Sequence, residues 1–146
     1  MILAALQTLI REMPTIAPLL ARWEFDATHK LAAVFTEEVP PSTCGVPVVC
    51  MKLDEDKDFE AVRSTNTRYR QAEITCRVWG EPEGSERGLR KLADALGLAL
   101  SKVSTLTLDE NLEFKRMTVR GPRRVKSDDG FPGYDFQLEV KYLDRR

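Results

Sequence analysis

Cysteine and histidine are scarce in this sequence, which contains three cysteines and a single histidine. The cysteines Cys44, Cys50 and Cys76 are odd in number and form no C-x-x-C motif, so the sequence predicts neither a disulfide framework nor a zinc site. The histidine, His29, follows Asp26 in a D-x-x-H motif. Two ligands fall short of the three or more that a protein metal site normally uses. We therefore interpret His29 as a surface loop residue, and we expect no metal and no cofactor.

An excess of charge of either sign is also missing. Lys and Arg total 22, Asp and Glu total 23, and the formal net charge is -1. Such a balance gives no overall attraction to nucleic acid or to an anionic membrane surface. With 42% hydrophobic and 31% charged residues, the composition argues against disorder. The 146 residues match the roughly 100–150 residues of a common single domain, so we predict one domain over residues 1–146.

A long hydrophobic run is absent, even at the apolar N-terminus. No basic residue precedes its apolar run, and Gln7, Thr8, Arg11 and Glu12 interrupt it, unlike in a signal peptide. The apolar positions recur instead at helical spacing, at Ile2, Leu3, Leu6, Leu9 and Ile10. The pattern predicts an amphipathic helix over Ile2–Glu12 and a protein that starts in the cytoplasm.

Motifs for catalysis and phosphate binding are missing too. The sequence contains no G-x-S-x-G, no G-x-x-x-x-G-K and no G-x-G-x-x-G. The segment EPEGSERG leads into a predicted helix, whose N-terminus could hold an anion in principle. However, Glu81, Glu83 and Glu86 crowd that position and would repel an anion, so a plain helix cap is the better interpretation. We predict that the protein is not an enzyme.

The strongest pattern that is present runs from Tyr69 to Leu100. Alternating apolar residues predict a strand with one buried face: Ala72, Ile74, Cys76 and Val78. After a break at Gly80, Pro82 and Gly84, Ser85 is a candidate N-cap. The apolar residues then recur at helical spacing: Leu89, Leu92, Ala93, Leu96 and Leu100. The stretch predicts a half-buried strand followed by an amphipathic helix over Ser85–Leu100.

Further strands are predicted over Ala32–Thr36, Val46–Leu53 and Phe114–Val119, with a bulge or bend at Gly121–Pro122. A last strand alternates most cleanly, with Tyr134, Phe136, Leu138, Val140 and Tyr142 on one side. The turn-like segment Ser127–Gly133 joins the last two strands into an antiparallel hairpin. These elements predict a single α+β domain, in which an antiparallel or mixed sheet of about four to five strands packs against two main helices.

Two charged segments are the candidate interaction sites. The segment Asp54–Thr67 shows almost no apolar periodicity, so we expect a projecting hairpin loop that is mobile in the free protein. Its acidic residues lack the glycine and the distal glutamate of an EF-hand, which leaves a solvated loop or an intersubunit contact. The basic run from Arg116 to Lys126 has little aromatic interleaving, which favours a solvated strand face or a salt-bridged interface over phosphate binding. Acidic and basic segments of one chain can pair between identical neighbours. The candidate interface residues are Asp54, Glu55, Asp56, Asp58, Glu81, Glu83, Glu86, Arg120, Arg123 and Arg124.

The order of these segments resembles the tail terminator or tail completion proteins of long-tailed, siphovirus-type bacteriophages and prophages. The similarity covers nearly the whole chain. It rests on the leading helix MILAALQTLIREMPTIAPLLA, the strand VPVVCMKL before a polar loop, the block TRYRQAEITCRVWGEPEGSERGLRKLADAL and the closing strand YDFQLEVKYL. The third segment is the most specific, because these proteins typically have a strand ending in an aromatic residue, a short polar turn and a helix rich in Leu and Ala. Trp79 and Leu89–Leu100 match that pattern.

The resemblance implies a non-enzymatic structural virion protein that caps the tail tube, terminates tail polymerisation and provides the head–tail joining surface as a hexameric ring. Its implied partners are other copies of itself, the major tail tube protein and the head–tail connector. The genome would pass through the ring without sequence-specific binding. The implied location is the head-proximal end of the tail, after assembly in the cytoplasm of the host bacterium.

Two alternatives remain open. The first is another neck or minor tail protein, such as a head–tail connector. The second is a small ligand-binding domain or enzyme of the host, which would need a concave pocket with converging polar groups.

Overall fold

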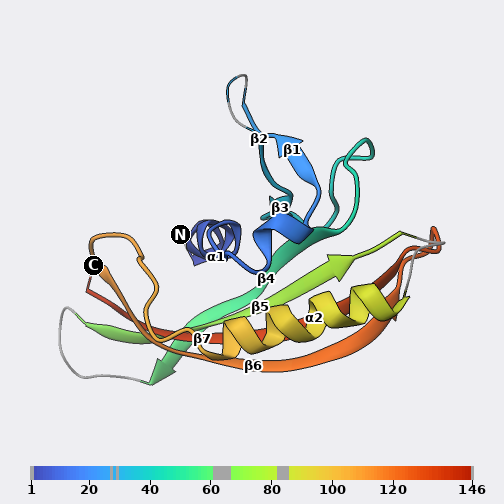
Figure 1. Ribbon diagram of the computed structural model, residues 1–146. Helices are drawn as coiled ribbons and strands as arrows, with labels where there is room; N and C mark the ends of the chain where they lie inside the picture. The colour runs from blue at the N-terminus through green and yellow to red at the C-terminus, as the bar shows by residue number, and fades with distance from the viewer. Residues whose placement is uncertain (1, 27, 29, 61–66, 82–85, 146) are drawn as a thin grey trace.

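A five-stranded sheet organises the chain (Figure 1). The computed structural model describes residues 2–26, 28, 30–60, 67–81 and 86–145, with only the backbone of residues 59, 60 and 86. The elements are α1 (Ile2–Arg11), the 3-10 helix η1 (Ala17–Leu19), β1 (Arg22–Glu24), β2 (Lys30–Ala32), β3 (Val34–Phe35), β4 (Val48–Glu60), β5 (Arg68–Trp79), α2 (Glu86–Ser101), β6 (Leu112–Lys126) and β7 (Pro132–Asp144).

The strand order in the main sheet is β3-β4-β5-β7-β6, and β1 and β2 form a separate two-stranded sheet. The short pair β3–β4 is parallel, whereas β4–β5, β5–β7 and β7–β6 are antiparallel. The predicted α+β domain, with a mixed sheet and two main helices, is confirmed.

The core lies on one face of the sheet. The predicted apolar face of β5 is fully buried, and its register places Ile74 beside Leu138 and Cys76 beside Phe136 of β7. Phe136, Leu138 and Val140 are at most 1% exposed. Because side chains of paired residues point to the same face, the two alternating patterns combine into one apolar layer.

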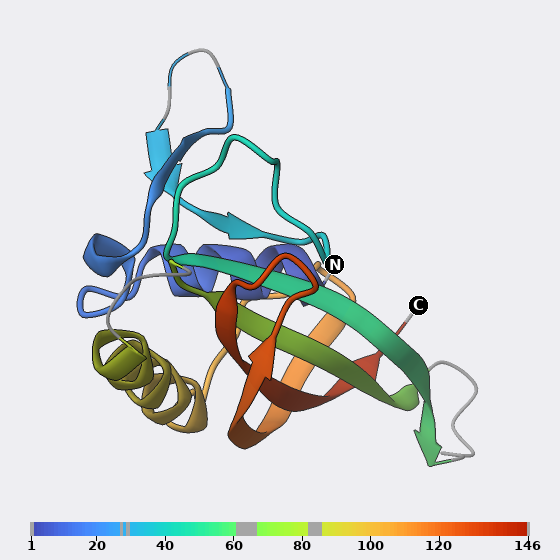
Figure 2. The same cartoon turned by 90° about the vertical axis from the view of Figure 1, so that its right-hand side faces the viewer.

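Both helices cover this layer (Figure 2). The buried side chains of α1 are Ile2, Leu3, Leu6 and Ile10, and those of α2 are Leu89, Leu92, Ala93, Leu96 and Leu100. A Cβ added at Gly97 would lie 2.7 Å from Phe136 Cε1, so the glycine lets α2 approach β7 closely. Both predicted helices are confirmed to within a residue, whereas the candidate N-cap Ser85 lies outside the described residues.

In the part of the chain that the structure describes, the opposite face of the sheet carries no helix and is mostly polar. Its end near Val48 is covered by a second apolar cluster, to which β1 contributes Trp23. Its buried members are Ala33, Phe35, Val48 and Cys50, and Trp23, Phe25 and Trp79 pack against them. The strand predicted over Ala32–Thr36 is divided at Ala33, where the backbone leaves β2 and joins β3. There Ala33 donates to Ala21 O and accepts from Val49 N.

The loop predicted over Asp54–Thr67 is wrong for its first half. Residues up to Glu60 belong to β4 and pair with β5, while residues 61–66 lie outside the described residues. Backbone hydrogen bonds hold this part of β4, and its polar side chains form cross-strand ion pairs. Hydrophobic periodicity cannot detect a strand that buries neither face.

The final hairpin follows the prediction and is longer. The strand predicted over Phe114–Val119 extends to Leu112–Lys126, and its register shifts between Arg120 and Arg123. The predicted bulge at Gly121–Pro122 is therefore confirmed. Gly121 has φ +116°, and a Cβ there would lie 2.8 Å from Asp135 O, so the bulge requires glycine.

Candidate functional site

The four predicted acidic residues of β4, at positions 54, 55, 56 and 58, are exposed on a paired strand rather than on a loop. Asp54 accepts a hydrogen bond from Thr75 Oγ1, with 2.5 Å between Oδ2 and Oγ1. Glu55 Oε2 lies 3.6 Å from Lys57 Nζ, and the Glu55 side chain is 50% exposed. These two carboxylates can therefore still reach a partner.

A cluster of polar side chains, here called the Tyr142 cluster, connects three strands of the sheet. Its members are Asp56 and Asp58 of β4, Arg70 of β5 and Tyr142 of β7. The Tyr142 hydroxyl donates to Asp56, whose two carboxylate oxygens each lie 2.8 Å from Oη. Arg70 Nε lies 3.3 Å from Asp56 Oδ1, and Arg70 Nη1 lies 3.1 Å from Asp58 Oδ1. Burial, and then the hydrogen bond to Asp56, raise the pKa of Tyr142 to about 12. At neutral pH the hydroxyl is therefore a proton donor that ties the acidic end of β4 to the sheet.

The basic run lies on β6 around the bulge. Arg123 Nη2 is 3.0 Å from Asp135 Oδ2, and Arg77 Nε is 3.8 Å from the same oxygen. The Asp135 side chain is only 3% exposed, so these two cations neutralise a buried carboxylate. Arg124 is exposed. Arg120 is exposed as well and forms no ion pair with any residue that the structure describes.

The glutamates predicted near the N-terminus of α2 form the third candidate group, and the structure describes only some of their side chains. Glu81 is exposed just after β5. Glu83 lies outside the described residues, as does the side chain of Glu86, the first residue of α2. That these three carboxylates repel an anion at the N-terminus of α2 stays a prediction.

The sheet keeps the acidic and basic segments of one copy apart. β4 and β6 are separated by β5 and β7 in the strand order. Pairing across the four long strands connects Asp56 of β4 with Met117 of β6. Arg123 of β6 is connected in the same way with Cys50, at the other end of β4. Pairing of these segments between neighbours stays a prediction.

Sequence reasoning missed Arg70, Tyr142 and Asp135 as polar partners. Arg70 and Asp56 are 14 residues apart, and Tyr142 is 86 residues from Asp56. Only the strand register brings these residues together. The tyrosine, on the apolar face of the predicted strand, looked like an ordinary core residue.

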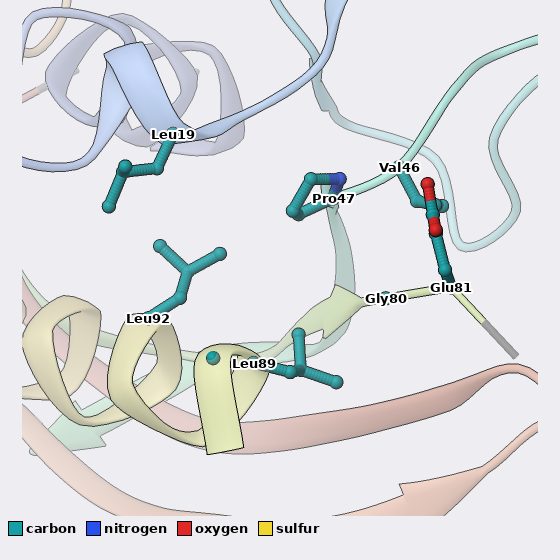
Figure 3. A pocket seen from close by; sticks show the side chains of 8 residues that line it. Leu19, Val46, Pro47, Gly80, Glu81, Leu89 and Leu92 are labelled. Carbon is teal, nitrogen blue, oxygen red and sulfur yellow. The ribbon is translucent and has the colours of Figure 1, made fainter. Parts of the chain in front are cut away.

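Two surface grooves border the loop before β4. The smaller has a volume of about 300 Å³, and Figure 3 shows Leu19 facing Leu92 across it, with Pro47 beside them. The larger, of about 600 Å³, lies between the loop around Pro40 and the turn around Ser127, and Arg77 and Trp79 also line it.

The thiols are poor candidates for nucleophilic chemistry. Burial raises the pKa of Cys50 and of Cys76 to about 12, and burial also raises the pKa of Cys44. Because the thiolate is the reactive form, these environments suppress reactivity at neutral pH. The predicted surface position of His29 concerns a residue outside the described part of the chain.

Among the described residues, no group of three or more His, Cys, Asp or Glu side chains is placed to hold a metal ion. Within the same residues, neither helix has the length and hydropathy that a bilayer span requires. Models of known protein families give no match to the chain, and curated proteins give none either.

Proposed function

We propose that this protein is a structural virion protein that forms a hexameric ring on the end of a phage tail tube. The ring stops tube polymerisation and presents the surface to which the head connector joins. The partners are other copies of the chain, the major tail tube protein and the head–tail connector. In this proposal the chain has no catalytic role, and it resides at the head-proximal end of the tail after assembly in the bacterial cytoplasm.

The observation that carries the proposal is the opposite charge of the two long edge segments of the sheet. Residues 52–60 of β4 include five acidic and two basic residues, whereas β6 includes six basic and one acidic residue. Two different, complementary edges favour head-to-tail contacts, which close into a ring when the rotation between copies permits. The whole-chain resemblance to tail terminator proteins supports the same proposal.

Exposed ion pairs contribute only about 0–1 kcal/mol each, so charge alone cannot hold such a ring. Apolar contacts and backbone hydrogen bonds must supply most of the affinity. Assembly should therefore weaken as salt is added without disappearing.

Deletion of the gene from its phage tests the function. The expected result is filled heads beside tails of abnormal length, or tails that do not join, when lysates are viewed by electron microscopy. Normal tail length together with normal joining would refute the proposal. A pull-down distinguishes a terminator, which captures the major tail tube protein, from another neck component, which captures only connector proteins.

The larger groove favours one second candidate, a small ligand-binding domain of the host. Arg77, Lys126 and the aromatic rings of Trp79 and Phe131 border its 600 Å³, which lies within the size range of small-molecule sites. This candidate predicts that a metabolite library contains a compound that raises the melting temperature, and that replacing Trp79 with alanine abolishes that shift.

A further inference from the structure

We propose that neighbouring copies join edge to edge, so that the free side of β4 in one copy pairs as an antiparallel strand with β6 of the next copy. This inference rests on the head-to-tail ring proposed above. It specifies the contact as a continuous sheet that passes from copy to copy.

Both edges are available for pairing. β3 pairs with β4 only at Val49 and Cys50, so β4 has a neighbour on one side alone from Lys52 onward. β6 is the terminal strand and pairs only with β7. Among the described residues, no backbone–backbone hydrogen bond joins the free side of β4 from Lys52 onward to another segment, and none joins the free side of β6 beyond its first residue, Leu112, which donates to Asp109 O. Unpaired strand edges of this kind are templates for another chain.

Strand direction fits this contact without any adjustment. Three successive antiparallel pairings separate β4 from β6, so these two strands run in opposite directions. When copies are repeated by a rotation that preserves strand direction, β6 of one copy meets β4 of the next as an antiparallel neighbour. The ring would then contain four long antiparallel strands from each copy.

Register shifts divide each edge into short regular runs. On β4 the longest run beyond Lys52 is Glu55–Asp58, and on β6 the longest run is Arg116–Arg120. Bulges on both sides of these runs, together with Pro122, restrict pairing elsewhere. The two runs, of four and five residues, are similar in length, and each can form a short ladder with the other.

The side chains on the helix-free face complete the match. Glu55 lies in one row with Glu73, Glu139 and Thr118, so Glu55 shares a face with Arg116 and Arg120. Closing a sheet into a ring requires each copy to be shifted along the strand direction relative to its neighbour. A shift of two residues places Glu55 of one copy directly across from Arg116 or Arg120 of the next.

The same residues disfavour two-fold pairing. A β6–β6 contact would place arginines against arginines, and on the other face of the sheet a β4–β4 contact would place Asp56 against Asp56 or Asp58, which is unfavourable for directly opposed residues. Both arginines are exposed and form no ion pair with a described residue. In contrast, Arg123 already neutralises Asp135. The intersubunit charges are therefore Arg116 and Arg120 rather than the predicted Arg123.

Charge reversal tests the contact. Glu55→Arg and the double variant Arg116→Glu/Arg120→Glu should each raise the protein concentration needed for half-maximal ring formation on tail tubes by about tenfold or more. The triple variant should return to within about threefold of the wild-type value. Lys91→Glu, at an exposed position of α2, is the matched control and should have no effect.

Cross-linking tests the geometry independently of any phage activity. In a Cys44→Ser background, Glu55→Cys mixed with Arg116→Cys or Arg120→Cys should give covalent dimers with a short bismaleimide, and each variant alone should not. Cross-linking of one variant with itself, or none in either mixture, would overturn the edge-to-edge contact. If wild-type protein caps tubes while the charge reversals have no effect, the inference fails and the proposed function stands. If wild-type protein does not cap tubes, the function fails.

Discussion

Replacing Tyr142 with phenylalanine should loosen the acidic end of β4 and leave the apolar core intact. The hydroxyl lies 2.8 Å from both carboxylate oxygens of Asp56. A hydrogen bond to a charged group contributes about 1.5–3 kcal/mol. Asp56 is 30% exposed and keeps its contact with Arg70, so water and the arginine compensate in part. We expect a loss around or slightly below the lower limit of that range, about 1–2 kcal/mol.

Hydrogen exchange measures this change where it should occur. A local loss of about 1–2 kcal/mol corresponds to roughly five- to thirtyfold faster exchange, confined to the amides of residues 55–58 and their partners on β5. Tyr69→Phe is the matched control, because Tyr69 lies in the same ribbon, is 36% exposed and has no hydrogen bond to a described residue. Equal exchange rates in wild type and Tyr142→Phe would refute the structural role of the cluster.

The same substitution has a signature at alkaline pH. Folding raises the pKa of Tyr142 from 10.0 to about 12. A raised folded-state pKa means that the contribution is complete below pH 10 and is lost as the pH rises toward 12. The free energy of unfolding of the wild type should therefore fall by about 1–2 kcal/mol more than that of Tyr142→Phe over this window. Parallel pH profiles for the two proteins would contradict the assignment.

Three further substitutions and one thiol probe test the packing. Leu138→Ala should lower the free energy of unfolding by about 2–5 kcal/mol in urea denaturation, and Leu138→Asp should prevent folding, so a cooperatively folded Leu138→Asp protein would disprove the core assignment. Gly133→Ala should lower the free energy of unfolding by about 1–3 kcal/mol, because the added Cβ would lie 2.5 Å from Trp79 Cε3. An unchanged melting temperature would argue against that contact. A thiol reagent at neutral pH should modify the half-buried Cys44 before the buried Cys50, whereas equal rates would show that the second apolar cluster opens readily.

The elements with one apolar face could be predicted from the sequence. Such a face has a period, and burial on one side is the cause of that period. For this reason the helix at Leu89–Leu100 and the strands around Ile74 and Leu138 were confirmed. The bulge at Gly121–Pro122 was also confirmed, because its backbone conformation restricts the residue type.

The acidic end of β4 could not be predicted in this way, because its side chains bury neither face and its pairing comes from backbone groups that every sequence shares. The polar partners required the tertiary structure for a related reason. Asp56 meets Tyr142, and Arg123 meets Asp135, only through the register of strands that are distant in the chain.

The sequence by itself determined which faces are apolar, and therefore the α+β layers, because burial of apolar surface drives folding. It also determined that acidic and basic residues fall in separate segments. Only the tertiary structure decided that these segments are strands at different edges of one sheet, running in opposite directions, with Arg123 engaged internally and Arg120 exposed. The physical reason is that strand order and register depend on contacts between distant segments, which no local pattern encodes.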